Sequence, residues 1–214
     1  MKLLITGTDT DAGKTVVTAA IAAALRAQGR TVWALKPLAT GGPPPGEDAT
    51  RIAAAAGHPP QVFQTALTPA SPERAFKLAG QPPADWHTLL SWIRGFDEDT
   101  LVEGVGGWEV PLGGGKRVSD LAVALGYPVV VVAGNRLGVL NHTLLTVEAI
   151  ARRGLPVLGV VLNSVPGGAA PDLQGWNLED LRAALPCPVV PFPTLRGGDL
   201  AQAGAPLLAL LPYS

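Results

Sequence analysis

The sequence predicts one α/β domain spanning residues 1–214, built on a mostly parallel sheet with helices on both faces. Two observations support this prediction. Short apolar runs alternate with amphipathic segments along the chain, as crossover connections between parallel strands require. The runs at 2–6, 100–103, 128–133 and 156–162 also show little polar alternation, which is typical of strands buried on both faces.

The first half of the chain begins with a strand at 2–6 and a helix that opens at Lys14-Thr15. Apolar residues at 17, 20, 21, 24 and 25 recur with helical spacing and give this helix one buried face. A strand at 31–36 ends before Pro37, and a loop at 38–46 leads to an alanine-rich helix at 47–56. Residues 57–83 have many prolines and little periodicity, so we expect irregular structure there, followed by a helix at 85–94 capped by Asp85.

The second half alternates strands and helices more regularly. The segment 128–133 is the run richest in β-branched residues and predicts a central strand. The remaining expected elements are a strand at 100–103, a loop containing Gly113–Gly115, helices at 118–125, 138–153 and 178–185, strands at 156–162 and 189–191, and a tail with one small helix.

The turn after the first strand has the features of a phosphate-binding loop. It runs from Gly7 to Gly13 and is followed by Lys14 and Thr15 at the start of a helix. In such a loop, backbone N–H groups and the positive helix end hold phosphate oxygens, the lysine reaches the outer phosphates and the hydroxyl ligates Mg²⁺. The strict pattern has glycine at the position of Thr8, whereas here glycine lies one residue earlier. The alternative is a tight strand-to-helix turn with a solvated lysine.

Ligands of parallel α/β sheets bind beyond the carboxyl ends of the strands. We therefore expect the residues that follow the strands to converge on one crevice. They are the loop after Thr6, Lys36, Glu103-Gly104, Gly134-Asn135, Asn163 and Pro191.

Several of these strand-end residues suit phosphoryl chemistry. Lys36 is a second lysine that can stabilise charge on a transferring phosphoryl group, or else a solvent-facing lysine at a strand end. Glu103 follows a buried strand, where a carboxylate is costly unless it is paired or bound to metal. Asp48 either joins it around Mg²⁺ or caps the following helix. Asn163 either offers its amide to a nucleobase or forms a turn.

Composition excludes several classes of function. The net charge of −1 gives no electrostatic footprint for nucleic acid or an anionic membrane. No apolar run approaches the roughly 20 residues that span a bilayer, and the first strand leaves no room for a signal peptide. The single cysteine, Cys187, excludes an internal disulfide and fits a reducing compartment. We therefore expect a cytoplasmic protein with partners other than nucleic acid or membrane.

These segments together resemble the dethiobiotin synthetases, ATP-dependent ligases of biotin biosynthesis with a P-loop NTPase-like fold. The resemblance covers nearly the whole chain. It rests on GTDTDAGKT at 7–15, LKPLATG at 35–41, the acid at Asp48, VEGVGGW at 102–108, LGVLNHTLLT at 137–146 and Asn163.

The resemblance implies a reaction of 7,8-diaminopelargonic acid, CO₂ and ATP, with Mg²⁺, to give dethiobiotin, ADP and phosphate. An amine would take up CO₂ as a carbamate, which attacks the γ-phosphate to form a carbamic–phosphoric anhydride. The second amine then closes the ureido ring and expels phosphate.

The resemblance also implies roles for individual residues. The implied catalytic residues are Lys36, Lys14 and Thr10, and the implied metal ligands are Thr15, Asp48 and Glu103. Nucleotide binding is implied for Asp11, Ala12, Gly13, Lys14, Thr15, Val16, Asp48, Glu103, Gly104, Val105, Gly106, Asn163, Pro191, Phe192 and Pro193. Substrate binding is implied for Lys36, Thr40, Val105, Gly106, Leu137, Gly138 and Asn141.

Two further implications concern the assembly and the nucleotide. Family members are homodimers, so Leu137–Asn141 would bind the substrate carboxylate of the neighbouring subunit. Relatives often carry a glutamate shortly after the segment that matches 191–193, whereas here the nearest acid is Asp199. This departure leaves the preference for ATP over other nucleoside triphosphates open.

Three other functions remain as alternatives. A regulatory ATPase of the partitioning type would carry a second lysine at the position of Thr8 and a basic or amphipathic terminal helix, and the sequence has neither. A P-loop amide synthase acting on a corrin acid would normally have a glutamine-hydrolysing domain. The third alternative is a nucleotide-binding module without turnover.

Overall fold

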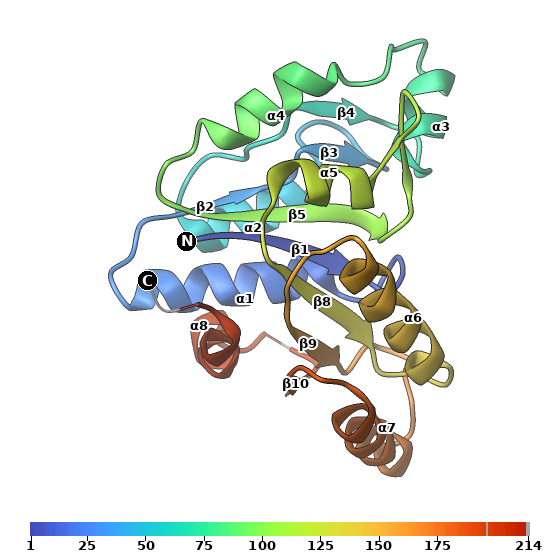
Figure 1. Cartoon of the computed structure of the whole chain (residues 1–214). Coiled ribbons are helices and arrows are strands. Elements are labelled where there is room, and N and C mark those ends of the chain that lie inside the picture. The colour runs from blue at the N-terminus through green and yellow to red at the C-terminus, as the bar shows by residue number, and fades with distance from the viewer. Residues whose placement is uncertain (196, 213–214) are drawn as a thin grey trace.

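The computed structural model describes residues 1–195 and 197–212 and contains a six-stranded sheet in which every pairing is parallel. The strand order is β10-β9-β8-β1-β5-β2, so β8 and β1 are central (Figure 1). This confirms the predicted α/β class. The strands are β1 (Lys2–Gly7), β2 (Val32–Leu35), β5 (Asp99–Gly107), β8 (Val129–Gly134), β9 (Val157–Asn163) and β10 (Val189–Phe192).

The apolar strands divide their side chains between two cores. Leu3 and Ile5 of β1 pack into one core and Leu4 into the other, as the two-residue repeat of a strand requires. Neighbouring β8 does the same with Val130 and Val131. The run of consecutive apolar residues in these strands therefore reflects burial on both faces.

Helices cover both faces of the sheet. On one face, α1 (Lys14–Ala27) contacts α2 (Glu47–Ala56), α8 (Leu200–Gly204) and a 3₁₀ helix (Ala205–Leu210). Residues of α1, α2 and the 3₁₀ helix belong to the core behind Leu3. The other core receives residues from α4 (Trp86–Arg94), α5 (Val118–Leu125), α6 (Val139–Arg152) and α7 (Pro171–Ala184). The helix expected after Asp85 is confirmed, and the Asp85 carboxylate accepts a hydrogen bond from the Thr88 N–H at 2.8 Å.

The irregular structure predicted for 57–83 is wrong in part. This segment holds β4 (Gln64–Ala66) and α3 (Pro72–Leu78), and β4 pairs with β3 (Leu38–Thr40) inside the expected loop at 38–46. In Figure 1 this small second sheet lies beyond β2, next to α4. A three-residue strand and a seven-residue helix are too short to produce a recognisable period.

Two other boundaries differ from the prediction. α7 begins at Pro171, seven residues before the expected start, because its first turns are polar and bury only Asn177 before Leu181. The loop around Gly113–Gly115 is a short antiparallel hairpin of β6 (Pro111–Gly113) and β7 (Lys116–Arg117). Neither difference alters the sheet.

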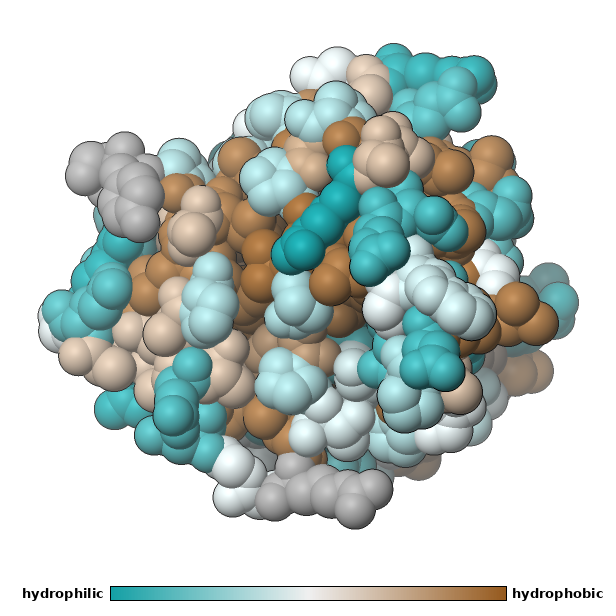
Figure 2. All heavy atoms as spheres, turned by 90° about the horizontal axis from the view of Figure 1, so that it is seen from below, coloured by the Kyte–Doolittle hydropathy of each residue, from teal (hydrophilic) through white to brown (hydrophobic). Residues whose placement is uncertain are grey.

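The surface at the end of the molecule that carries β10, α7 and α8 is mixed. Figure 2 shows this face with hydrophobic residues across its middle and polar residues between them and at the rim. No helix in the described part of the chain combines the length and apolar composition needed to cross a bilayer.

Candidate active site

The predicted phosphate-binding loop joins β1 to α1 and is held in place by its glycines. Gly13 has φ +93°, and a Cβ there would lie 2.0 Å from the Asn163 Nδ2. That same amide donates a hydrogen bond to the Ala12 carbonyl at 3.0 Å. A Cβ at Gly7 would lie 3.1 Å from the Lys14 Nζ. Glycine is therefore needed at position 13, where the Asn163 side chain approaches the backbone, and at position 7, where the Lys14 side chain does. Asn163 stabilises the loop through its hydrogen bond to Ala12.

Lys14 lies inside this loop with little access to water. Its side chain is 7% exposed, and its Nζ donates to the Asp9 carbonyl at 3.1 Å. Burial, together with repulsion from Lys36, lowers the pKa of Lys14 from 10.5 to about 8. A phosphate bound in the loop would place a negative charge next to Lys14 and would stabilise its ammonium form.

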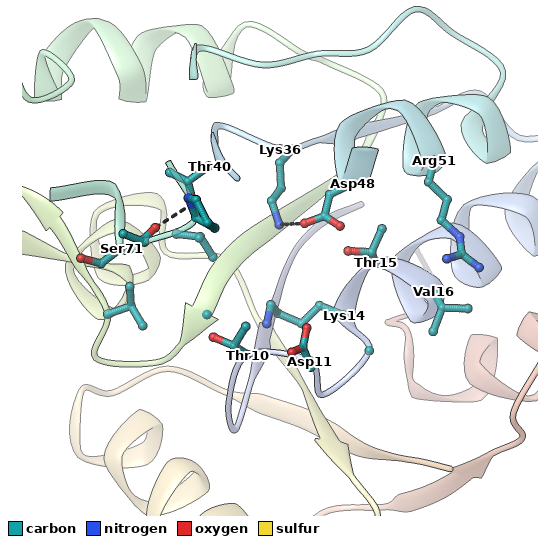
Figure 3. Close-up of a pocket in the computed structure, with 16 residues that line it drawn as sticks. Thr10, Asp11, Lys14, Thr15, Val16, Lys36, Thr40, Asp48, Arg51 and Ser71 are labelled. Carbon is teal, nitrogen blue, oxygen red and sulfur yellow. Dashed lines mark hydrogen bonds and ion pairs between the residues drawn. The ribbon is translucent and has the colours of Figure 1, made fainter. Parts of the chain in front are cut away.

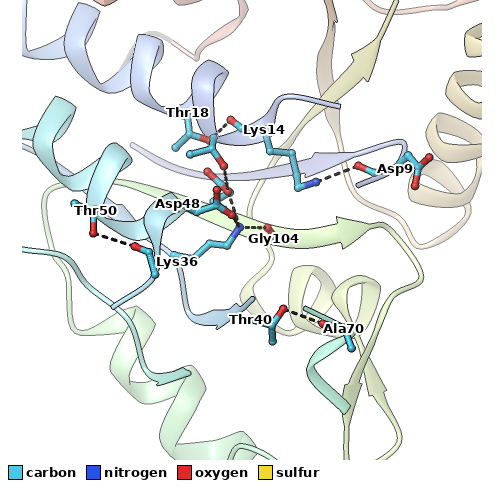
Figure 4. A network of polar contacts seen from close by, with 12 residues as sticks. Asp9, Lys14, Thr18, Lys36, Thr40, Asp48, Thr50, Ala70 and Gly104 are labelled. Carbon is cyan, nitrogen blue, oxygen red and sulfur yellow. Dashed lines mark hydrogen bonds and ion pairs between the residues drawn. The ribbon is translucent and has the colours of Figure 1, made fainter. Parts of the chain in front are cut away.

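Lys36 joins the two predicted acids. Its Nζ lies 2.6 Å from the Glu103 Oε1 and 2.8 Å from the Asp48 Oδ2, and it also donates to the Gly104 carbonyl at 3.2 Å (Figure 4). Lys36 follows β2 directly, Glu103 lies on β5 and Asp48 is in the first turn of α2. Three elements thus bring these groups together at the carboxyl end of the sheet.

The charges of this cluster support one another. Burial opposes the charge on Lys36, which is 3% exposed, but attraction to Glu103 and Asp48 outweighs burial and raises its pKa. Burial likewise opposes the charge on Asp48, and Lys36 outweighs it and holds the pKa of that carboxyl below its usual value. The lysine is therefore an ammonium and the acid a carboxylate at neutral pH.

The oxygen donors beside Lys36 fit a hard divalent cation. The Thr15 hydroxyl donates to the Glu103 Oε1 at 2.8 Å, and the Glu103 Oε2 is buried with no hydrogen-bond partner. An unpaired buried carboxylate oxygen is costly unless something binds it. Within the described residues, no three or more His, Cys, Asp or Glu side chains are placed so that they could hold a metal ion, and two acids and one hydroxyl are the candidate ligands.

These groups line an open cleft of about 570 Å³. Figure 3 shows Thr40 and Ser71 on one side of it, Lys36, Asp48 and Thr15 in the middle, and Val16 and Arg51 on the other side. The Thr40 hydroxyl donates to the Ala70 carbonyl at 2.8 Å. The predicted site residues that line the cleft are Thr10, Asp11, Gly13, Lys14, Thr15, Val16, Lys36, Thr40, Asp48, Val105 and Gly106, while Glu103 and Gly104 meet it through Lys36.

The expectation that all strand ends meet in one crevice is wrong in part. The Asn135 amide donates to the Gln174 carbonyl and its side-chain oxygen accepts from Asn177, so Asn135 faces α7. Asn163 and Pro191 also lie outside the cleft lining.

Other predicted residues lie apart from the cleft as well. The Phe192 side chain is 1% exposed and belongs to the core behind Leu3, while the prolines on either side of it are exposed. Asp199, the acid nearest to this segment, caps α8 by accepting from the Ala201 N–H at 2.8 Å. Leu137, Gly138 and Asn141 lie at the start of α6 and do not line the cleft.

The cleft also contains residues that the sequence analysis did not select. They are Arg51, Pro69, Ala70, Ser71 and Val110. Arg51 carried a usable signal, because it lies three residues after Asp48 and therefore on the same face of α2. The stretch 69–71 was hidden inside the segment expected to be irregular.

Comparisons with known proteins identify close relatives. A family model described as an AAA domain matches residues 1–192. The ATP-dependent dethiobiotin synthetase BioD of Aromatoleum aromaticum is 38% identical, with 95% of each chain covered. The enzymes of the same name from Cellvibrio japonicus and Rhodococcus jostii are 39% and 41% identical, covering 97% and 94% of this chain and 96% and 89% of their own.

Solved structures agree on the fold. The cell division ATPase MinD of Pyrococcus furiosus superposes with a TM-score of 0.58 at 18% identity, covering 98% of this chain and 97% of its own. The cobyrinic acid a,c-diamide synthase of Mycobacterium smegmatis, solved with ADP and magnesium, gives 0.52 at 18% identity, covering 96% and 91%. At this identity the likeness concerns the fold alone.

Proposed function

The chain belongs to the family of ATP-dependent dethiobiotin synthetases, and we propose that it converts 7,8-diaminopelargonic acid and CO₂ to dethiobiotin with ATP and Mg²⁺. The observation that carries the proposal is the cluster in which Lys36 bridges Glu103 and Asp48 beside the phosphate-binding loop. A carbamate and a phosphoryl group are both anions, and a buried ammonium in the same cleft suits the transfer between them.

The residues divide the work by position. The loop N–H groups hold the inner phosphates, Lys14 reaches the terminal ones, and Thr10 also lines the cleft. Lys36 orients the carbamate oxygen toward the γ-phosphate and stabilises the charge that develops on the transferring group. Thr40, on the opposite wall, offers its hydroxyl oxygen to the diamine.

Thr15, Asp48 and Glu103 would hold Mg²⁺, because their oxygens include the unpaired Glu103 Oε2. The ion would neutralise phosphate charge. Lys36 shares both carboxylates with that site, so the same two acids tie the lysine to the metal-binding residues.

The proposal extends to a homodimer whose sites are completed by the start of α6. Leu137, two residues before α6 begins, is 84% exposed and Leu145 on α6 is 58% exposed, so α6 and the residues before it present apolar side chains to solvent. The Val139 N–H after Gly138 donates to the Arg136 carbonyl at 3.1 Å, and the following first-turn N–H groups of α6 would suit a carboxylate.

The deciding experiment follows phosphate release from ATP in the presence and absence of the diamine and bicarbonate, with dethiobiotin measured in parallel. We expect release to depend on both co-substrates and to match product formation. Phosphate release that is the same with and without the diamine and bicarbonate would identify a switch-type ATPase and overturn the ligase assignment.

A further inference from the structure

Arg51 is a cationic side chain in the lining of the cleft. It lies on α2 one turn after Asp48, lines the same cleft and is exposed. None of the salt bridges among residues 1–195 and 197–212 involves it. Lys36 differs in this respect, because it contacts two carboxylates. Lys14 forms no salt bridge among these residues either, but its Nζ donates to a backbone carbonyl inside the loop.

The position of Arg51 along the cleft is as informative as its charge. Figure 3 shows its side chain extending from α2 toward Val16, on the side away from Thr40 and Ser71. Val16 belongs to the first turn of α1, directly after Thr15. In a phosphate-binding loop, backbone N–H groups hold the inner phosphates, while the lysine reaches outward to the terminal ones. Arg51 therefore faces the inner-phosphate end.

We propose that Arg51 is a nucleotide-binding residue that contacts the α- and β-phosphates from α2, opposite the phosphate-binding loop. This inference rests on the proposed ATP-dependent function. Guanidinium binds phosphate oxygens through two parallel hydrogen bonds, and an exposed arginine loses little hydration when it does so. Asp9 and Asp11 make the loop acidic, so an additional cation offsets repulsion of the incoming nucleotide.

A phosphate contact makes a distinctive prediction, because phosphates are common to all nucleotides. Arg51→Ala should weaken binding of ATP, GTP and CTP by the same factor, about tenfold. ADP should lose as much as ATP, since the contact does not involve the γ-phosphate. Arg51→Lys keeps the charge without the paired hydrogen bonds and should lose an intermediate factor.

The test is isothermal titration of the purified full chain with each nucleotide and Mg²⁺, without the diamine. Lys77→Ala is the matched control, because it removes one exposed positive charge from α3 outside the cleft lining. Thermal melting of each variant without nucleotide shows whether the fold is unchanged. The wild-type affinity should also fall more steeply with salt than that of Arg51→Ala.

The outcomes separate the two proposals. Equal losses for ATP, ADP and the other nucleotides, with Lys77→Ala unchanged, support the phosphate contact. Wild-type affinity in Arg51→Ala, a loss confined to ATP, or a loss that depends on the base overturns it while leaving the ligase function standing. A wild-type chain that makes no dethiobiotin although nucleotide binding needs Arg51 instead overturns the proposed function alone.

Discussion

Replacing Lys36 by methionine tests the central cluster directly. Methionine keeps most of the apolar stem and removes only the ammonium, which contacts Glu103 at 2.6 Å and Asp48 at 2.8 Å. Glu103 is 1% exposed, so it becomes a buried carboxylate whose one remaining hydrogen-bond donor among the described residues is the Thr15 hydroxyl. Asp48 is 51% exposed at its side chain and can return to water.

The size of the effect follows from this difference between the two acids. Removing one partner of a buried ion pair costs about 3–5 kcal/mol. Because only Glu103 is left buried without a cationic partner, we expect the lower end of this range, a loss of about 3 kcal/mol in the free energy of unfolding at neutral pH. Product formation should fall by about 10²-fold or more, as for the loss of a group that stabilises transition-state charge.

Urea unfolding followed by circular dichroism measures the stability change, and the double variant Lys36→Met/Glu103→Gln is the control. If the unpaired Glu103 carboxylate causes the loss of stability, the second substitution should restore about 2 kcal/mol of the free energy of unfolding. Mg²⁺ should also stabilise Lys36→Met more than the wild type, because both acids become available to it. A single variant within about 0.5 kcal/mol of wild type, or strictly additive effects, would refute this account.

Three other predictions concern the loop, its lysine and the α6 surface. Gly13→Ala should destabilise the protein well beyond Gly29→Ala, because both positions have positive φ but only Gly13 places a Cβ against Asn163; urea unfolding gives both values, and the strain at Gly29 alone should cost about 1 kcal/mol. ADP affinity should fall above about pH 8, close to tenfold per pH unit, because the lowered pKa of Lys14 means that the free protein must take up a proton to bind phosphate; calorimetry across this range checks it, and Lys14→Met should flatten the profile. The sign for stability is opposite, since the penalty for charged Lys14 is present in full below pH 8 and is relieved as pH rises from about 8 toward 10.5. Leu145→Arg should dissociate the proposed dimer and abolish dethiobiotin formation, which light scattering with chromatography and the product assay can show; a dimer that survives with full activity would place the interface elsewhere.

The features that follow from local chemistry could be predicted from the sequence. The loop from Gly7 to Thr15 has a recognisable pattern because phosphate binding needs glycines, a lysine and a hydroxyl at fixed spacing. Buried strands such as 128–133 are apolar and β-branched over their whole length, so their type and place in the sheet were predictable. The rule that ligands bind beyond the carboxyl ends of parallel strands was enough to predict that Lys36 and Glu103 lie at the same edge of the sheet.

The features that depend on very short elements or on contacts between distant parts of the chain were not predictable. The sequence allowed Asn163 to bind a nucleobase or, more commonly for an Asn after a strand, to form a turn, and only the tertiary structure shows its amide donating to the Ala12 carbonyl. Arg51 needed the three-dimensional position of α2 against α1 before its side chain could be placed in the lining of the cleft.

The sequence by itself determined the α/β architecture and the chemical groups available for phosphoryl transfer, because apolar periodicity and loop spacing are local properties. Only the tertiary structure decided which charges pair. Lys36 is buried beside Glu103 and Asp48, and their attraction raises its pKa. Lys14 is buried without a carboxylate contact, and its pKa is lowered. The local sequence around the two lysines does not predict these opposite shifts, because they depend on which carboxylates the fold brings near.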